Sequence, residues 1–469
     1  MHVFTMPVDK WDELNPDKQS ILHLIQKHRS GIARMDRLKD YYEGKHKIAG
    51  DTDRENKLVC NHAKDISDTA SAYFIGNPVV YNCKEDITVM TDALNNAEAD
   101  EADGDNGLDL SIYGRAYEYI YTKRDETELS IKNLAPQNTF VVYDDSIEQN
   151  ELFAVYYYKR VDFTDRTNPV YVATVLTQNY KYVLNIEEIE GPQALLETPE
   201  PHYKGEVPVI EYLNNKLGIG DYELQIPLID AYNVLMSDRI TDKEQFIDAI
   251  LAIYGTLLSD NDAEEEGDEK GAENAMSRLK KKKLLEMPGE GAHAEYLTRT
   301  YDESGVEILK KAIEQDIHKF SHIPCMTDES FGGNVSGVAM EFKLLGMENI
   351  TKIKTRYYKK GLRKRLRIFA NYIALHKSIS IDVSGIEPTF TRAMPKNLLE
   401  ISQYVANLWG KVSRKTLLAQ IPFVDDPEEE LKIVEKEEQE YLQKQQAMFG
   451  MTANTPPDNP TIKDDVDEE

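Results

Sequence analysis

The chain has 469 residues, enough for roughly two or three domains, and 41% of them are hydrophobic. Its formal net charge of −28 argues against a protein that reads DNA sequence, which usually carries a basic footprint. The negative charge is compatible with an acidic channel wall past which DNA slides. The simpler interpretation is that the charge keeps the protein soluble. Cys60, Cys83 and Cys325 are too scattered for a disulfide framework or a Cys-x-x-Cys zinc site, which suits a reducing cytosol.

The N-terminal part of the chain is predicted to be mainly helical. Apolar residues at helical spacing predict helices over 9–43, 57–75 and 86–113. A short strand is expected at 79–83, after the turn residues that end the second helix. We expect the third helix to be interrupted over 98–107, because this segment is acidic and contains glycine.

Beyond residue 113 the apolar period changes from that of a helix to that of a strand. β-branched and aromatic residues predict six strands, over 116–122, 129–133, 139–143, 152–161, 170–177 and 180–189. Turn residues separate these strands, so the region is predicted to be an antiparallel sheet that helices precede in the chain. Tyr156, Tyr157 and Tyr158 are interpreted as sheet packing rather than as a base-stacking platform, because no Lys/Arg groove accompanies them.

Two long helices are predicted in the middle of the chain. The first, over 225–258, would be about 50 Å long, and Pro227 fits its first turn. A helix of this length needs a partner that covers its apolar stripe. We therefore expect the helix over 302–322 to return antiparallel beside it. The apolar face of this second helix consists of Val306, Leu309, Ile313, Ile317 and Phe320.

The segment 259–301 between these helices is predicted to form a small α/β tip. It opens with an acidic loop over 260–269, and short strands are expected at 283–287 and 294–298. Its most basic residues are Arg278, Lys280, Lys281, Lys282 and Lys283. This run is interpreted either as a surface for DNA or a protein partner, or as a solvated loop that balances the acidic segment.

A polar, glycine-rich break follows the second long helix. Pro324 ends that helix, because the residue before a proline is disfavoured in the α region. The break contains Thr327, Asp328, Glu329, Ser330, Phe331, Gly332, Gly333, Asn334, Val335 and Ser336. Ser336 is a suitable N-cap for a helix over 337–377, which would be about 60 Å long. Gly346 and Gly361 are the predicted points of bending in it.

Basic residues surround this long helix and leave its apolar stripe free. They are Lys352, Lys354, Arg356, Lys359, Lys360, Arg363, Lys364, Arg365 and Arg367. Salt bridges with acidic neighbours are the preferred interpretation, and direct DNA contact is the alternative. After the helix, a strand is expected at 379–383. Helices are expected at 397–410, 413–420 and 426–448, followed by a disordered acidic tail over 450–469.

No catalytic or metal signature is found, and no cofactor is expected. The chain lacks a phosphate-binding P-loop and a His-Glu-x-x-His motif. His318 and His322 are four residues apart, but no carboxylate or cysteine is spaced to complete a metal site with them. The pairs Asp144-Asp145 and Asp425-Asp426 mean little in so acidic a chain. No apolar run approaches the ~18 residues of a membrane span, and residues 1–10 do not resemble a signal peptide.

The order of several motifs carries a family resemblance. Ile323-Pro324 is followed by Ser330-Phe331-Gly332-Gly333-Asn334-Val335-Ser336-Gly337-Val338-Ala339-Met340 and a basic helix. Supporting motifs are Tyr41 to Ile48, Asn56 to Lys64, Gly76 to Val79, Pro395 to Asn397, Gly410 to Ser413, Thr416 to Leu418 and Asp425 to Pro427. Taken together over residues 35–435, this chain resembles the portal proteins of tailed double-stranded-DNA bacteriophages, especially siphophages of Gram-positive hosts.

The resemblance implies an α+β subunit of a dodecameric ring at one capsid vertex. It implies a wing (1–224 and 337–394), a stem (225–258 and 302–322), a clip (259–301), a tunnel loop (323–336) and a crown (395–449). Within that loop, Thr327 to Ser336 would face double-stranded DNA without reading its sequence. The glycines of this loop permit changes of backbone conformation. Such a protein is not an enzyme, because a separate terminase ATPase supplies the energy for packaging.

The resemblance also implies several partners. The terminase large subunit would dock on the clip at Arg278, Lys280, Lys281, Lys282 and Lys283, and head-completion and tail proteins would follow after packaging. Scaffolding and major capsid proteins would contact the wing. The ring would assemble in the host bacterial cytoplasm and remain in the virion, where it serves DNA packaging and ejection. The alternatives are a non-translocating head–tail connector and, from a different class, a metal-dependent nucleic-acid-processing enzyme.

Overall fold

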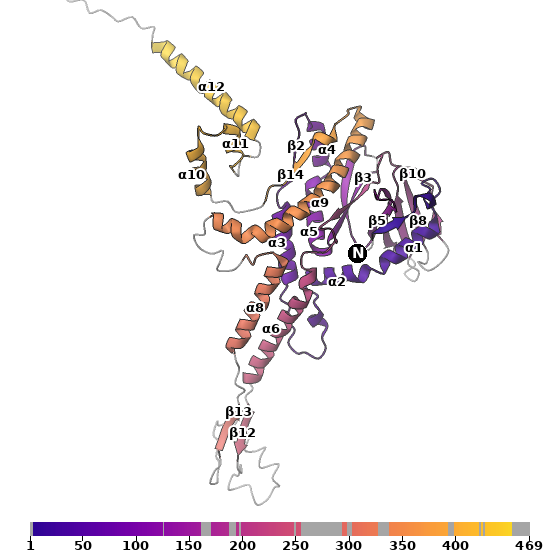
Figure 1. Cartoon of the computed structure of the whole chain (residues 1–469), viewed down its shortest axis with the longest axis vertical. Coiled ribbons are helices and arrows are strands. Elements are labelled where there is room, and N and C mark those ends of the chain that lie inside the picture. The colour runs from indigo at the N-terminus through magenta and orange to yellow at the C-terminus, as the bar shows by residue number, and fades with distance from the viewer. Residues whose placement is uncertain are drawn as a thin grey trace, which may run out of the picture. The chain divides into compact units, whose positions relative to one another are not determined.

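A computed structural model gives the fold. It describes residues 3–124, 126–160, 170–186, 194–196, 198–247, 250–254, 293–297, 303–326, 337–392, 398–421, 424 and 427–452. The chain divides into two compact units, which Figure 1 draws together. The first unit comprises Met1–Asp328 and Lys343–Ala393, and the second comprises Glu329–Phe342 and Met394–Glu469. The mixture of helices and sheets confirms the predicted α+β class.

The N-terminal helices are shorter than predicted, because polar residues cap them. They are α1 (Lys18–Arg29), α2 (Ile32–Tyr42), α3 (His62–Ile75), α4 (Thr88–Asn96) and α5 (Ala99–Tyr113). The Asp17 carboxylate accepts hydrogen bonds from the backbone N–H groups of Gln19 and Ser20, which fixes the start of α1. Asn61 caps α3 in the same way through the N–H of Lys64. The helix predicted over 9–43 is therefore two helices, preceded by a 3-10 turn at Val8–Lys10.

The predicted interruption over 98–107 is wrong. The chain turns only at Ala97 and Glu98, where Glu98 has φ 56°, and α5 then runs without a break to Tyr113. Asp103 is 2% exposed because partners in other elements satisfy its carboxylate. Gly107 lets α5 approach α3 closely, since a Cβ there would lie 2.5 Å from the Cγ2 of Ile75.

The predicted antiparallel strands are confirmed and form two sheets. The larger has the order β1-β5-β6-β7-β8-β10, with β9 also paired to β8, and only its β1–β5 pair is parallel. Its strands are β1 (Phe4–Met6), β5 (Thr139–Asp144), β6 (Glu151–Arg160), β7 (Val170–Leu176), β8 (Tyr180–Ile186), β9 (Ala194–Leu196) and β10 (Glu200–Pro201). The smaller has the order β11-β3-β4, from β11 (Val209–Leu213), β3 (Arg115–Thr122) and β4 (Leu129–Leu134).

Separate apolar clusters pack helix α1 on the larger sheet and the two sheets on each other. Helix α1 packs on the larger sheet, where Ile21 and Ile25 join Phe140 and Phe153 in one cluster. A second cluster joins the two sheets, and Tyr157 is buried within the first, which agrees with the sheet-packing interpretation of the tyrosine run. The strands β1, β9, β10 and β11 lay outside the sequence prediction.

Three long helices follow the sheets. They are α6 (Ile226–Ile247), α8 (Glu303–Ser321) and α9 (Gly337–Lys377). Helix α6 ends earlier than predicted, because Ile250–Tyr254 forms strand β12 and pairs antiparallel with β13 (His293–Leu297). The physical cause is that the β-branched and aromatic residues of 250–254 pair with the strand β13. The strand expected at 283–287 lies outside the described residues.

The C-terminal part of the chain contains one further correction. No strand forms at 379–383 among the described residues. A 3-10 turn at Val383–Gly385 leads instead to β14 (Glu387–Thr389), which pairs with β2 (Val80–Asn82). The predicted helices of the second unit are confirmed as α10 (Leu398–Leu408), α11 (Arg414–Leu418) and α12 (Pro427–Thr452).

Helix α9 is joined to the core by a buried ion cluster. Arg365 is completely buried, and its Nη2 lies 2.5 Å from the Asp103 carboxylate of α5. The same guanidinium binds Glu118 of β3, with Nε 2.9 Å from Oε1. Tyr358 donates to Asp103, and Tyr212 donates to Glu118. Burial alone would lower the pKa of Arg365, but the two carboxylates reverse this effect and hold it well above its usual range.

Replacing Arg365 tests this cluster. Arg365→Met leaves Asp103 and Glu118 as buried charges without their cation, so we expect the free energy of unfolding to fall by about 3–5 kcal/mol. The matched control is Arg37→Met at an exposed arginine of α2, with an expected change within about 0.5 kcal/mol. Urea unfolding followed by circular dichroism measures both. Equal effects of the two substitutions would contradict the proposed importance of the cluster.

Candidate functional site

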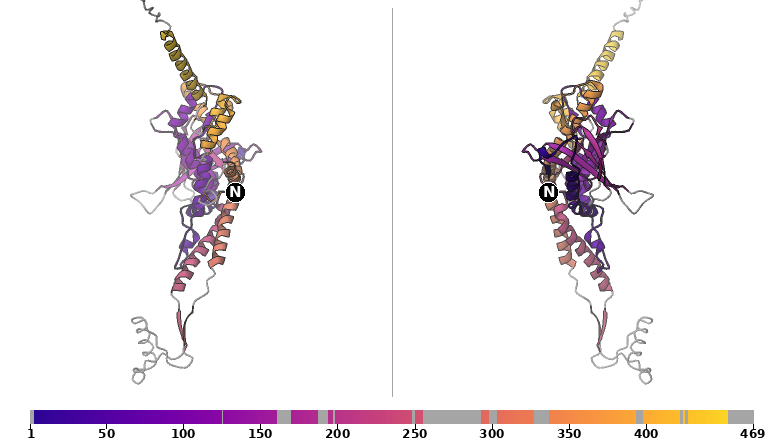
Figure 2. Two further views of the ribbon diagram at one scale, coloured as in Figure 1. Left: turned by 90° about the vertical axis from the view of Figure 1, so that its left-hand side faces the viewer. Right: turned by 90° about the vertical axis from the view of Figure 1, so that its right-hand side faces the viewer.

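Helices α6 and α8 form an antiparallel pair. Arg239 of α6 lies 2.8 Å from Glu307 and 3.3 Å from Glu303 at the start of α8, and Lys243 lies 3.2 Å from Glu303. The end of one helix therefore lies beside the start of the other, as predicted. The views of Figures 1 and 2 agree that the two helices run side by side and lead to β12 and β13.

Much of the apolar surface of α8 is not covered by α6. Of the predicted apolar face, Ile317 is fully buried, whereas Leu309 is 50% and Phe320 is 55% exposed. Ile308, beside this face, is 70% exposed. Leu309 and Phe320 lie on the same side of the helix, and exposed apolar surface of this kind is used for association with other proteins.

One face of α6 is anchored by an extended segment of the chain. The backbone N–H of Leu58 donates to the Ser237 hydroxyl at 2.9 Å, and that of Cys60 donates to the Asn233 side chain at 2.8 Å. Asn56 adds a hydrogen bond to Thr241 at 3.2 Å. The α6 partners are spaced four residues apart, so they lie on one face of the helix.

Sequence reasoning missed this anchor. The sequence predicts residues 57–61 as the start of a helix over 57–75, but α3 begins only at His62, and the residues before it contact α6 instead. The signal was present, because Asn233, Ser237 and Thr241 place uncharged polar groups at four-residue spacing along one face of the predicted helix. Asn233 is completely buried and also bonds to His46, with 2.7 Å between the side-chain nitrogens.

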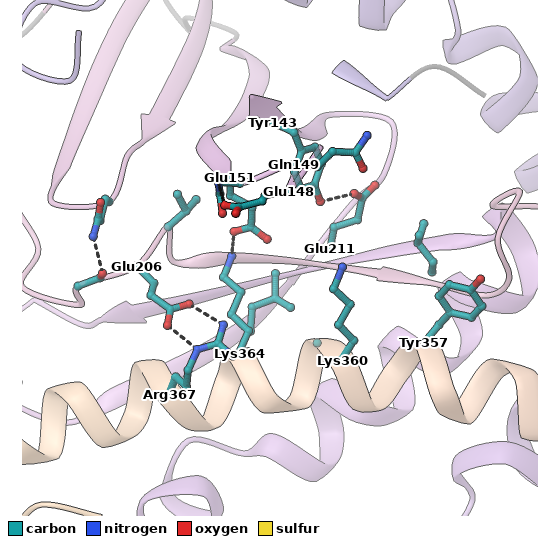
Figure 3. Close-up of a pocket in the computed structure, with 17 residues that line it drawn as sticks. Tyr143, Glu148, Gln149, Glu151, Glu206, Glu211, Tyr357, Lys360, Lys364 and Arg367 are labelled. Atoms are coloured by element: carbon teal, nitrogen blue, oxygen red, sulfur yellow. Dashed lines mark hydrogen bonds and ion pairs between the residues drawn. The ribbon is translucent and has the colours of Figure 1, made fainter. Parts of the chain in front are cut away.

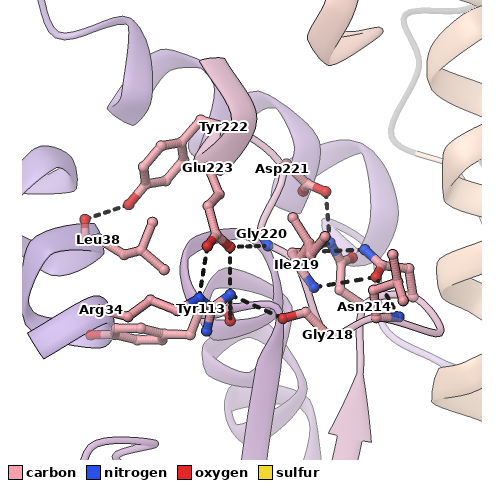
Figure 4. Close-up of polar contacts among 12 residues, drawn as sticks. Arg34, Leu38, Tyr113, Asn214, Gly218, Ile219, Gly220, Asp221, Tyr222 and Glu223 are labelled. Carbon is pink, nitrogen blue, oxygen red and sulfur yellow. Dashed lines mark hydrogen bonds and ion pairs between the residues drawn. The ribbon is translucent and has the colours of Figure 1, made fainter. Parts of the chain in front are cut away.

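The loop before α6 is held by charged side chains, as Figure 4 shows. Arg34 of α2 donates to Glu223 at 2.7 Å and to the carbonyl of Gly218 at 3.1 Å. Lys354 of α9 lies 2.7 Å from Asp221, and both side chains are buried. The start of α6 is thus fixed to α2 on one side and to α9 on the other.

Two glycines make this junction sterically possible. Gly114 has φ 77°, and a Cβ there would lie 2.4 Å from the backbone of Gly218. A Cβ on Gly220 would lie 2.4 Å from the carbonyl oxygen of Ile112. The backbones meet too closely for any side chain, so the path into α6 depends on both glycines.

A pair of histidines lies where α8 ends. The rings of His62 and His318 are 5.7 Å apart, and His318 Nδ1 is 3.0 Å from the carbonyl oxygen of Ile323. Burial lowers the pKa of His62, and His318 lowers it further, so the His62 imidazole is neutral near pH 7. No group of three metal-ligating side chains occurs among the described residues.

The tunnel loop residues Thr327 to Ser336 and the clip residues Arg278 and Lys280 to Lys283 lie outside the described residues. The structure does describe what precedes and follows the loop. His322 has φ 60° and turns the chain out of α8, and α9 begins at Gly337. These residue roles remain predictions.

Several basic residues of α9 form the predicted salt bridges. Lys354, Lys364 and Arg365 are 2%, 6% and 0% exposed, and each pairs with a carboxylate of its own chain. Lys364 also donates to the carbonyl of Val209 at 2.7 Å. The interpretation as ion pairs with acidic neighbours is therefore confirmed for this inner face of the helix.

A cavity of about 490 Å³ lies between α9, β11 and the turn that joins β5 to β6. Figure 3 shows Lys364 paired with Glu151 and Arg367 paired with Glu206 along its floor. Lys360 extends from α9 into the same space. The lining combines these charge pairs with apolar side chains such as Val207 and Ile210.

Comparison with known proteins gives the family. Residues 21–444 match the family described as "Phage portal protein, SPP1 Gp6-like". The chain belongs to this family of phage portal proteins. It is 24% identical over 424 residues to the portal protein of Bacillus phage SPP1, covering 86% of this chain and 81% of that protein. It is 22% identical over 419 residues to the portal protein of Clostridium phage phiCD119, covering 81% and 84%.

Two solved structures are also similar to this portal-family chain. One is the neck of a native GTA particle, computed with C12 symmetry, at a TM-score of 0.41 and 12% identity, covering 77% of this chain and 88% of that one. The other is the neck of an empty GTA particle, computed with C6 symmetry, at a TM-score of 0.43 and 12% identity, covering 77% and 89%. Within the part of the portal chain that the structure describes, no helix has the length and hydropathy to cross a membrane.

The anchor of α6 is tested by removing its central side chain. Asn233→Ala in the portal chain leaves the Cys60 N–H without its acceptor, so we expect a loss of about 1–3 kcal/mol in the free energy of unfolding. Hydrogen exchange of residues 56–60 should accelerate, because their backbone is held by α6. The control is Asn96→Ala at an exposed asparagine that ends α4. Unchanged exchange at Cys60 in the Asn233 variant would show that the anchor is not formed in solution.

Proposed function

We propose that this chain is one subunit of a closed dodecameric ring at one vertex of a phage capsid. Double-stranded DNA would enter and leave the capsid through the ring. The observation that carries the proposal is the α6–α8 pair, which is anchored at one end and leaves Leu309 and Phe320 about half exposed. Head-to-tail contacts with a closing rotation produce rings, and exposed apolar helix faces supply such contacts. Family membership over residues 21–444 supports the same conclusion.

The parts of the subunit have separate proposed roles. Residues 225–258 and 302–322 form the stem, in which α6 and α8 lie. Residues 1–224 and 337–394 form the wing, which contacts scaffolding and major capsid proteins. Residues 395–449 form the crown, and 450–469 form an acidic tail. The ring assembles in the host bacterial cytoplasm and remains at the capsid vertex of the virion.

The clip over 259–301 is the proposed docking site for the terminase large subunit. Its basic residues Arg278 and Lys280 to Lys283 would bind the motor first and head-completion and tail proteins afterwards. Energy comes from the terminase, so the portal chain itself catalyses no reaction. The tunnel loop, Thr327 to Ser336, contacts the DNA backbone without reading bases.

Ring assembly is tested by electron microscopy and sedimentation. The purified chain should form rings with a central hole and a mass many times that of the 53.6 kDa subunit. Leu309→Asp combined with Phe320→Asp should abolish rings and leave a folded monomer, because charges would replace the exposed apolar contacts. The control is Ile147→Asp in the turn between β5 and β6, where the isoleucine is fully exposed. A wild-type chain that stays monomeric even with scaffolding protein present would contradict the ring.

The tunnel loop is tested separately from assembly. Phe331→Ala combined with Asn334→Ala should leave rings intact and impair packaging, because these side chains are proposed to press on the passing duplex. The measurement is the length of DNA protected inside capsids that carry the variant ring and the terminase. Loss of the rings themselves would instead place Phe331 and Asn334 at a structural contact.

A further inference from the structure

The outer face of α9 carries a stripe of positive charge. Its members are Lys352, Arg356, Lys360, Arg363 and Arg367, which we call the basic stripe. They follow one another at steps of three or four residues, and at about 100° per residue they fall within roughly 80° of the helix circumference. All five side chains are exposed. The stripe is about 22 Å long.

Three of the five stripe residues form no ion pair within the described part of the chain. Lys352 lies 3.7 Å from Glu348 and Arg367 lies 2.6 Å from Glu206. Arg356, Lys360 and Arg363 form no ion pair with any described residue. These three cations neighbour one another on the helix, so they repel each other unless an acidic partner covers them.

Lys360 and Arg367 border the cavity beside β11, whereas Arg356 and Arg363 lie on the side of α9 that faces away from α5. Tyr358 and Arg365 face α5, because both contact Asp103. At about 100° per residue they lie on the side of α9 opposite to Arg356 and Arg363. The unpaired cations therefore cannot reach the acids of α5 in the same chain.

Helix α5 carries the complementary charge on its own outer side. Glu98, Glu101 and Asp105 are exposed and form no ion pair with the described residues; we call them the acidic face. Glu101 and Asp105 lie on the side of α5 opposite to Asp103, again because each residue turns the helix by about 100°. The packed pair of α5 and α9 thus presents negative charge on one side and positive charge on the other.

Such a polar arrangement fits a neighbouring copy of the same chain. In a ring, each subunit offers one surface to the subunit ahead and a different surface to the subunit behind. We propose that the basic stripe of α9 binds the acidic face of α5 on the next subunit. This inference rests on the proposed ring and identifies one of its contacts. It also explains how chains that each carry a net charge of −28 approach one another.

Charge reversal tests the contact from both sides. A stripe variant combines Arg356→Glu with Arg363→Glu, and a face variant combines Glu101→Lys with Asp105→Lys. Each variant alone should need at least about tenfold more protein than the wild type for half-maximal assembly, because like charges would meet at every contact. Sedimentation at physiological ionic strength measures assembly, and circular dichroism verifies folding. The control combines Arg37→Glu with Lys216→Glu, which makes the charge change of the stripe variant at exposed sites elsewhere.

Mixing the variants makes the test specific. Every contact in an alternating ring joins complementary surfaces, because the stripe variant keeps its acidic face and the face variant keeps its basic stripe. Equimolar mixing should therefore restore assembly, and so should one chain that carries all four substitutions. This reciprocal rescue is not expected of variants that simply misfold.

Three results would overturn the inference, and they are distinguishable. Variants that assemble as the wild type does would show that these surfaces do not meet, while the proposed ring would stand. A stripe variant that assembles normally but binds a fluorescent DNA duplex less tightly would assign the stripe to nucleic acid. A wild-type chain that forms no ring under any of these conditions would remove both the proposed function and this contact.

Discussion

The buried charge of Arg365 is the constraint on which the rest of this subunit depends. A guanidinium without access to water is costly unless opposite charges neutralise it, so Asp103 of α5 and Glu118 of β3 converge on its Nε and Nη2 edge. Lys364, the residue next to Arg365, and Lys354, about three turns away, repeat this requirement toward β6 and toward the loop before α6. One helix therefore fixes the positions of a helix, a sheet and the path into the paired helices.

Directional polar contacts likewise hold the α6–α8 pair. Polar groups at four-residue spacing on α6 receive hydrogen bonds from an extended strand of backbone, and Arg34 with Glu223 fixes the loop before it. The attachment at the start of α6 is directional, because hydrogen bonds and ion pairs fix orientation more narrowly than apolar contacts do. The apolar side chains of α8 remain available for association. A subunit built in this way keeps its paired helices in one orientation while their exposed face contacts other molecules.

The periodicity of apolar residues correctly predicted those elements that neighbouring residues in the sequence determine. Alternation located β5, β6, β7 and β8 of the larger sheet, and helical spacing located α9. The failures occurred where distant partners decide the structure. The acidic segment 98–107 is helical because Asp103 meets Arg365 more than 250 positions later. Residues 250–254 leave the helix because His293–Leu297 offers them a strand. The anchor of α6 escaped prediction for the same reason, since Asn233 meets Cys60 only in the folded chain.

The two sides of α9 show how one basic helix serves two purposes. On the inner side, positive charge is dehydrated and must be neutralised within the chain, so Lys354, Lys364 and Arg365 are committed to folding. On the outer side, Arg356 and Arg363 stay hydrated, and leaving them unpaired costs the monomer little. They are free to respond to a second surface. Among like-charged subunits, attraction within about a Debye length of 8 Å can outweigh net repulsion only where opposite charges meet directly. The charged residues that remain unpaired in the folded subunit are therefore the ones that can determine how one subunit is oriented against the next.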